Sequence, residues 1–166
     1  MLHAARAEPD RLVIGIDADV ASMRRSSRTA ADRRVGRANA VFVVSAVEAL
    51  PCELAGVADR VTINFPWGSL LRGLMHGDDS VLRNIAMVCA PGAEIAALWS
   101  ITGRDRGVVG PCDEGVVRSR FAGAGMDVAE VRPATGHEVE TSHSSWAKRL
   151  RVGHDRPATL LRAFRR

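Results

Sequence analysis

The sequence has few cysteines and no long apolar run. Its three cysteines, Cys52, Cys89 and Cys112, are far apart, and it has neither a Cys-x-x-Cys pair nor paired histidines. Neither a disulfide framework nor a zinc site is therefore indicated, and we expect no metal centre. No apolar stretch approaches the length of a membrane span, and the first residues lack the apolar core of a signal peptide. These absences argue against a membrane or secreted protein and predict a soluble, cytoplasmic one.

Lysine is nearly absent as well, because Lys148 is the only one in 166 residues. The basic surface is therefore made of guanidinium groups, which suit bidentate contacts with phosphates and stacking on bases. The net charge of +4 is moderate, but the basic residues gather in two clusters. These are Arg24, Arg25, Arg28, Arg33, Arg34 and Arg37, and Lys148, Arg149, Arg151, Arg156, Arg162, Arg165 and Arg166. Each cluster is equally consistent with a solvated face and with a surface that binds nucleic acid.

Apolar strand patterns alternate with helical patterns along the chain. Strands are expected at residues 11–19, 40–45, 61–64, 93–100, 126–131 and 157–164. Helices are expected at residues 20–31, 69–75, 79–89, 113–125 and 144–150, and residues 133–142 are expected to form a polar loop. In a chain of one-domain length, this alternation predicts a single three-layer α/β domain with a mainly parallel sheet. The final strand is expected to close the sheet and can run antiparallel to the others.

Two carboxylates, Asp17 and Asp19, follow the apolar run of the first strand. A carboxylate at this place in a nucleotide-binding sheet can accept hydrogen bonds from both hydroxyls of a ribose. The same residues can also cap the helix that starts at Val20. Both interpretations stay open, and each carboxylate could take one of the two roles.

The second strand is followed by small residues. Ala46 and Val47 leave room for a flat ring to lie against the backbone, and Glu48 could meet the polar edge of that ring. Many junctions between a strand and a loop share this pattern, so it indicates a ligand site only in combination with others.

A third strand ends in Asn64, and Pro66, Trp67, Gly68 and Ser69 follow it before an apolar helix. Ligands of α/β sheets bind at this carboxyl edge, and an amide, a rigid turn and an indole there form a face suited to a flat polar ring. The alternative for a lone tryptophan is a position in the core. For Trp99, at the end of another strand, packing is the simplest interpretation.

Four segments together resemble a known family: GIDAD, SAVEALP, NFPWGSLL and SSWAKRL. They are similar to the aminoglycoside-resistance methyltransferases of the Kam and Npm type, which modify adenine N1 in the decoding site of 16S ribosomal RNA. The similarity covers nearly the whole chain from about Leu2, and the segments FPWG and SxWAKRL are its specific motifs. The tRNA guanine-N7 methyltransferases are more distant in pattern. The resemblance implies a Rossmann-like class I fold dependent on S-adenosylmethionine (SAM).

The resemblance also implies roles for single residues on the cofactor side. Asp17 would bind the ribose of SAM, and the loop beside the cofactor adenosine would contain Ala46, Val47 and Glu48. Two hydroxyl groups, on Ser69 and Ser144, would lie close to the cofactor and the target base.

On the RNA side, Trp67 and Trp146 would sandwich an adenine that has been turned out of the RNA. The partner implied is 16S rRNA within the small ribosomal subunit, bound by a monomer without involvement of a membrane. The residues expected to contact RNA are Arg24, Arg25, Arg28, Arg33, Arg34, Lys148, Arg149 and Arg156.

One feature of the family pattern has no counterpart in the sequence. The first strand and the glycine-rich loop of the fold, which approach the methionine end of SAM, would precede Leu2. We therefore expect an N-terminally truncated methyltransferase domain that binds SAM weakly or not at all. An active RNA methyltransferase and an inactive remnant that still binds the ribosome both remain open at this stage.

Overall fold

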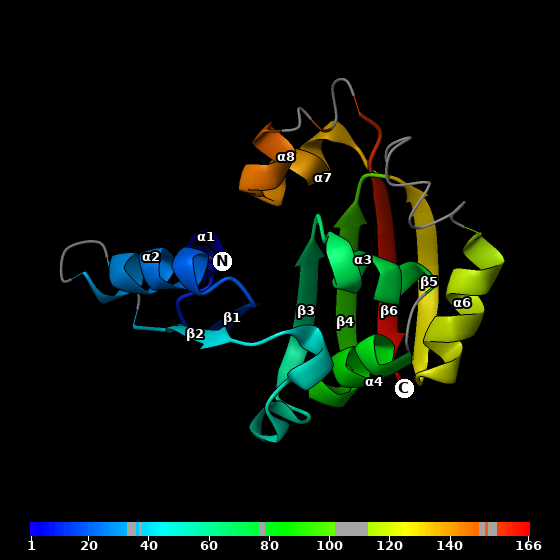
Figure 1. Ribbon diagram of the computed structural model, residues 1–166, viewed down its shortest axis with the longest axis horizontal. Helices are drawn as coiled ribbons and strands as arrows, with labels where there is room; N and C mark the ends of the chain where they lie inside the picture. Colours follow the sequence, from blue (N-terminus) through cyan, green and yellow to red (C-terminus); the bar gives the residue numbers. More distant parts are fainter. Residues whose placement is uncertain (33–35, 37, 77–78, 102–112, 150–151, 153–155) are drawn as a thin grey trace. The chain divides into compact units, whose positions relative to one another are not determined.

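The computed structural model describes residues 1–32, 36, 38–76, 79–101, 113–149, 152 and 156–166. The chain divides into two compact units, Met1–Leu50 and Pro51–Arg166 (Figure 1). Each unit has its own sheet, and each is described by itself below. The expectation of a single domain stays a prediction.

The first unit is built on a pair of parallel strands. Its elements are α1 (Leu2–Ala7), β1 (Val13–Asp17), α2 (Val20–Ala31), β2 (Ala40–Val44) and the 3-10 turn η1 (Val47–Ala49). The two strands pair in register from Val13 beside Ala40 to Asp17 beside Val44. Their carboxyl ends therefore lie side by side, which brings the residue after β1 next to the loop after β2.

A single amide side chain joins α1 to this strand pair. The side-chain nitrogen of Asn39 lies within 3.0 Å of the backbone oxygens of Ala5, Glu8 and Arg11. These carbonyls come from the end of α1 and from the turn that follows it, in which Pro9 cannot continue the helix. Asn39 thus ties the end of α1 and the turn that follows it to the start of β2.

The second unit contains a four-stranded sheet in the order β3-β4-β6-β5. Its elements are η2 (Cys52–Leu54), β3 (Ala58–Asn64), α3 (Gly68–Met75), α4 (Asp79–Val88), β4 (Cys89–Trp99), α6 (Glu114–Gly123), β5 (Met126–Pro133), α7 (Gly136–Thr141), α8 (Ser145–Arg149) and β6 (Thr159–Arg165). β3 and β4 are parallel, and β6 is antiparallel to both of its neighbours. The α/β class and the parallel pairing predicted from the sequence are confirmed.

Two expectations differ from the structure. The last strand was expected to close the sheet, but β6 lies between β4 and β5, where Leu161 and Ala163 are completely buried. Residues 133–142 were predicted to form a polar loop, and that prediction is wrong, because α7 forms there. The hydroxyl of Thr135 and the carboxylate of Glu138 build a capping box that starts this helix.

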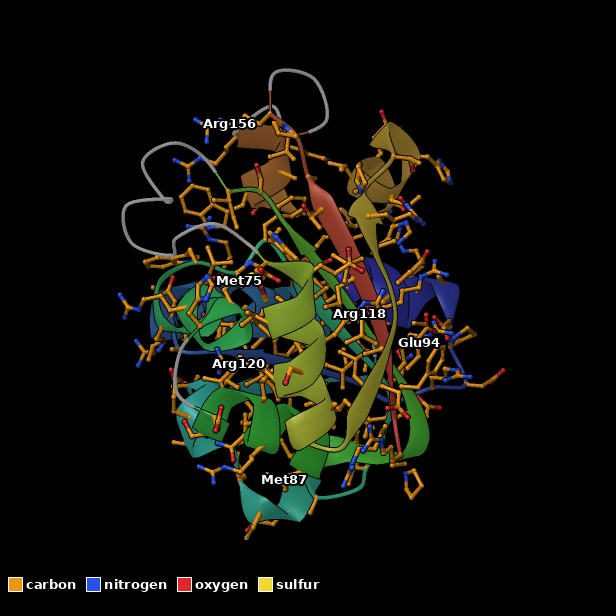
Figure 2. All side chains as sticks on the ribbon, turned by 90° about the vertical axis from the view of Figure 1, so that its right-hand side faces the viewer. Met75, Met87, Glu94, Arg118, Arg120 and Arg156 are labelled. Carbon is orange, nitrogen blue, oxygen red and sulfur yellow. The ribbon has the colours of Figure 1, made fainter. Side chains whose placement is uncertain are left out.

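The helices α3, α4 and α6 cover one face of the sheet and form the core with it (Figures 1 and 2). Trp99 at the end of β4 is only 1% exposed, which confirms that it is a packing residue. Two arginines of α6 connect this helix to β5 and to α4. Arg118 donates to the backbone oxygen of Val128 in β5, and Arg120 lies 3.3 Å from Asp79 of α4 (Figure 2).

Gly73 allows α3 to approach α4 closely. A β-carbon at this position would lie 2.4 Å from the side chain of Val81, which is itself buried. Gly73→Ala should therefore destabilise the fold by roughly 1–3 kcal/mol through overpacking, although alanine is the better helix former. Urea unfolding followed by circular dichroism would measure the change.

Gly123 provides the matched control for that substitution. It lies at the end of α6, and a β-carbon there would meet nothing within 4 Å. Gly123→Ala should leave the stability unchanged or raise it by up to about 1 kcal/mol. An equal effect of both substitutions would contradict the packing argument.

Candidate functional site

The turn after β3 buries one aromatic residue and exposes the next. Phe65 adopts a left-handed backbone conformation with φ of 52°, its backbone nitrogen donates to the oxygen of Leu98 at 2.7 Å, and its side chain is buried. Pro66 follows, and Trp67 is the residue that directly precedes the first turn of α3. Trp67 is 72% exposed. It is therefore not a core residue, which was the alternative to a ligand-binding role.

A second exposed indole comes from α8. Trp146 is 43% exposed, whereas its neighbour Ala147 is buried. Ala147 belongs to a group of buried residues that we call the Phe65 cluster: Phe65, Leu98, Val139, Ala147, Val152, Ala158 and Leu160. This cluster joins α7 and α8 to the carboxyl ends of β3 and β4 (Figure 1).

The Phe65 cluster places both exposed indoles at the same end of the second unit. Trp67 follows Phe65 by two residues, and Trp146 directly precedes Ala147. Large exposed aromatic side chains at the carboxyl edge of a sheet are suited to stacking on a flat ligand. The expectation that these two tryptophans serve one site stays a prediction.

Polar and basic side chains surround Trp146. The guanidinium carbon of Arg149 lies 5.4 Å from the centre of the Trp146 ring, a cation–π contact within one helix. The hydroxyl of Ser144 accepts a hydrogen bond from the backbone nitrogen of Ala147 at 3.3 Å and so caps α8. Lys148 is exposed on the same helix, and Arg156 lies at the same end of the unit (Figure 2).

In the first unit, the two carboxylates after β1 take different roles. The side chain of Asp19 accepts from the backbone nitrogen of Ala21 at 2.9 Å and caps α2. Asp17 is exposed at the end of the strand, where one of its oxygens accepts from the backbone nitrogen of Asp19 at 2.9 Å. Helix capping is thus confirmed for Asp19, and Asp17 is the carboxylate that lies at the strand edge.

The loop after β2 lies beside Asp17. The backbone nitrogen of Ser45 donates to the backbone oxygen of Asp17 at 3.1 Å, and Ala46 is the next residue in the loop. Ala46 and Glu48 are exposed, and Val47 is half-buried at the start of η1. The loop that contains residues 46–48 therefore starts beside the end of β1, and the role of these residues in one site with Asp17 stays a prediction.

The remaining predicted site residues fall on several elements. Ser69 is exposed in the first turn of α3, and α2 carries the exposed residues Arg24, Arg25 and Arg28. Arg33 and Arg34 lie outside the described residues. The predicted site residues thus fall into two groups, one in each unit.

Sequence reasoning missed an ion-pair network at the start of α7. Nη1 and Nη2 of Arg132 donate to the two carboxylate oxygens of Glu138 at 2.9 and 2.7 Å, and Nε donates to Glu130 at 3.0 Å. The backbone nitrogen and hydroxyl of Thr135 also donate to Glu138. The signal for this network was the spacing Thr-x-x-Glu, which is typical of a helix start.

In the described part of the chain, no three residues among histidine, cysteine, aspartate and glutamate are grouped so that they could hold a metal ion. Among the same residues, no helix has the length and apolar character needed to cross a membrane.

Comparisons with known proteins give a consistent result. Residues 1–165 match the family model described as NpmA, 16S rRNA (adenine(1408)-N(1))-methyltransferase. The 16S rRNA (adenine(1408)-N(1))-methyltransferase of Streptoalloteichus tenebrarius is 34% identical over 163 residues, which cover 92% of this chain and 75% of that protein.

Solved structures agree with the sequence comparison. The 16S rRNA methyltransferase KamB matches with a TM-score of 0.87 at 30% identity, covering 98% of this chain and 80% of that one. A variant of the enzyme from Catenulisporales acidiphilia, solved with its cosubstrate SAM, matches with a TM-score of 0.81 at 31% identity. That match covers 99% of this chain and 79% of the variant. The Rossmann-like methyltransferase fold expected from the sequence is thereby confirmed.

Glu138 should make the stability of the fold depend on pH. The hydrogen bonds from Arg132, followed by those from Thr135, lower its pKa from 4.5 to about 2. Because the folded pKa is depressed, this stabilisation is complete above about pH 4.5 and is lost as the pH falls toward 2. The stability difference between wild type and Glu138→Gln should therefore be largest near neutral pH and should shrink on acidification. Urea unfolding at a series of pH values would measure it, and a difference that stays constant would contradict the assignment.

Proposed function

Because this chain belongs to the family of 16S rRNA (adenine(1408)-N(1))-methyltransferases, we propose that it transfers a methyl group from SAM to N1 of an adenine in the decoding site of 16S rRNA. Its substrate is the small ribosomal subunit, and it acts as a monomer in the cytoplasm. Methylation at this position confers resistance to aminoglycosides.

The observation that carries this proposal is the pair of exposed indoles at one end of the second unit. Adenine N1 lies on the Watson–Crick edge, so the base must leave its stack before a methyl donor can reach it. Trp67 and Trp146, 72% and 43% exposed, replace the lost stacking. Each contact between a base and an aromatic ring contributes roughly 1–3 kcal/mol.

The residues after β1 and β2 fit the nucleoside part of SAM. Asp17 presents an exposed carboxylate at a strand edge, where it can accept hydrogen bonds from a ribose diol. Ala46 and Val47 offer little bulk, so an adenine ring can lie against their backbone, and Glu48 is exposed beside them. When bound, SAM supplies an electrophilic methyl group on a positively charged sulfur.

Catalysis in this proposal is positioning rather than proton transfer. The neutral N1 of adenine carries a lone pair and is itself the nucleophile, so no general base is needed. Trp67 and Trp146 fix the plane of the ring, which holds N1 in line with the transferred methyl group. The hydroxyls of Ser69 and Ser144 border this site. The oxygen of Ser144 accepts a bond from its own helix, which leaves its O–H group and a second lone pair for a ligand.

Basic side chains form the contacts with the RNA backbone in this proposal. Arg24, Arg25 and Arg28 are exposed along α2, and Lys148 and Arg149 are exposed on α8. Such groups bind the phosphate backbone by charge and shape, independently of base sequence. Selection of a single adenine therefore rests on the architecture of the ribosomal site.

Replacement of the stacking indoles tests this function. We expect the intact chain, expressed in an aminoglycoside-sensitive bacterium, to produce a primer-extension stop at the decoding-site adenine. Trp67→Ala and Trp146→Ala should each lower the rate of methyl transfer by about 10- to 100-fold, in line with a lost stacking contact. Trp146→Phe should retain most of the activity, because it keeps an aromatic face.

The control for this experiment is subunit binding measured by co-sedimentation. A chain that co-sediments with small subunits and gives no stop would be an RNA-binding protein without catalysis, and the proposal would be wrong. Equal rates for wild type and both alanine variants would contradict the role of the indoles.

Substitution of Asp19 should affect the stability of the fold, whereas substitution of Asp17 should affect cofactor binding. Asp19→Ala should destabilise the fold by about 1 kcal/mol, because α2 loses its cap, and it should leave the affinity for SAM unchanged. Asp17→Ala should weaken SAM binding with little effect on stability. Thermal unfolding and calorimetric titration with SAM would measure both quantities, and the reverse pattern would assign the ribose to Asp19.

A further inference from the structure

The arm that carries Trp146 has little packing of its own. It consists of α7 and α8, which are six and five residues long. Each buries a single side chain, Val139 in α7 and Ala147 in α8. Isolated helices of this length are not stable in water, so contacts with the rest of the unit must hold the arm in place.

The sheet supplies a directional contact to this arm. Arg132 lies in β5, where it pairs with Leu160 of the buried strand β6, so its backbone is fixed. Its guanidinium meets Glu138, in the first turn of α7, through two hydrogen bonds of 2.9 and 2.7 Å. A double contact between two planar groups defines an angle as well as a distance. The side chain of Glu138 is 22% exposed, so it is partly shielded from water.

We propose that this fork between Arg132 and Glu138 is a positioning device, which sets the direction of α7 and thereby the place of the Trp146 indole. The inference rests on the proposed function, in which Trp146 stacks on the target base. Neither Arg132 nor Glu138 touches substrate in this proposal. They act through α7, the turn at His143 and α8.

The capping box at the same place has a separate task. The bonds between Thr135 and Glu138 lie within the first turn of α7, so they determine where the helix starts. The bonds from Arg132 connect that turn to β5 and determine where the helix points. Because glutamine can also serve in a capping box, Glu138→Gln keeps the cap and breaks the charged fork. Thr135→Ala removes the hydroxyl of the cap and keeps the fork.

The experiment compares these two variants of the full chain with Asp127→Asn. Asp127 pairs with Arg166 at the opposite end of β5, so this variant controls for the loss of an ion pair on the same strand. The readouts are the single-turnover rate of methyl transfer to small subunits, the affinity for SAM, and amide hydrogen exchange in α8.

Glu138→Gln should slow methyl transfer by about tenfold or more at unchanged SAM affinity, since misplacing a reacting group by about 1 Å can cost about 100-fold. It should also accelerate hydrogen exchange in α8. Thr135→Ala and Asp127→Asn should retain the wild-type rate. Arg132→Lys, which keeps the charge but lacks the planar fork, should slow the reaction as well.

The fork would be refuted if Glu138→Gln and Thr135→Ala had the same transfer rate and the same exchange in α8. In that case Glu138 would serve only to start the helix. If the wild-type chain methylates no subunits, the proposed function fails. The proposal about Arg132 and Glu138 is then tested by hydrogen exchange alone, through the comparison of α8 in Glu138→Gln and Thr135→Ala.

Discussion

The architecture of the candidate site depends on the packing of the Phe65 cluster. Phe65 adopts a left-handed backbone conformation in this cluster, which costs an L-residue roughly 1–2 kcal/mol. Burial of its aromatic side chain offsets that cost. Because the same cluster contains Val139 and Ala147, one apolar contact region holds both the turn before Trp67 and the arm of Trp146.

This division of labour suits a reaction that needs geometry more than proton transfer. The residues that fix the chain are buried and apolar, whereas the two tryptophans assigned to the target base are exposed and lie one or two positions away. Trp67 follows Phe65, and Trp146 precedes Ala147. Apolar packing does not define the orientation of every element. In α7, which has six residues, burial of a single valine cannot set the direction of the helix, and the polar contacts of Glu138 add this constraint.

Much of this could be predicted from the sequence, because the periods of the longer strands and helices were clear. The pattern left helix capping open for both Asp17 and Asp19, and only the backbone geometry shows that Asp19 is the cap. The helix α7 was missed because its six residues are mostly polar, although its capping box was visible. The internal position of β6 depends on long-range pairing, which the periodicity of a single strand does not specify.

The scarcity of lysine makes chemical modification of the chain selective for one side chain. The one lysine of the chain, Lys148, is exposed on α8 between Ala147 and Arg149. A reagent that acylates amines therefore has one side-chain target besides the N-terminal amine, and that target lies two residues from Trp146. Because acylation removes the positive charge of Lys148, the modified chain would show what this charge contributes to the binding of small subunits.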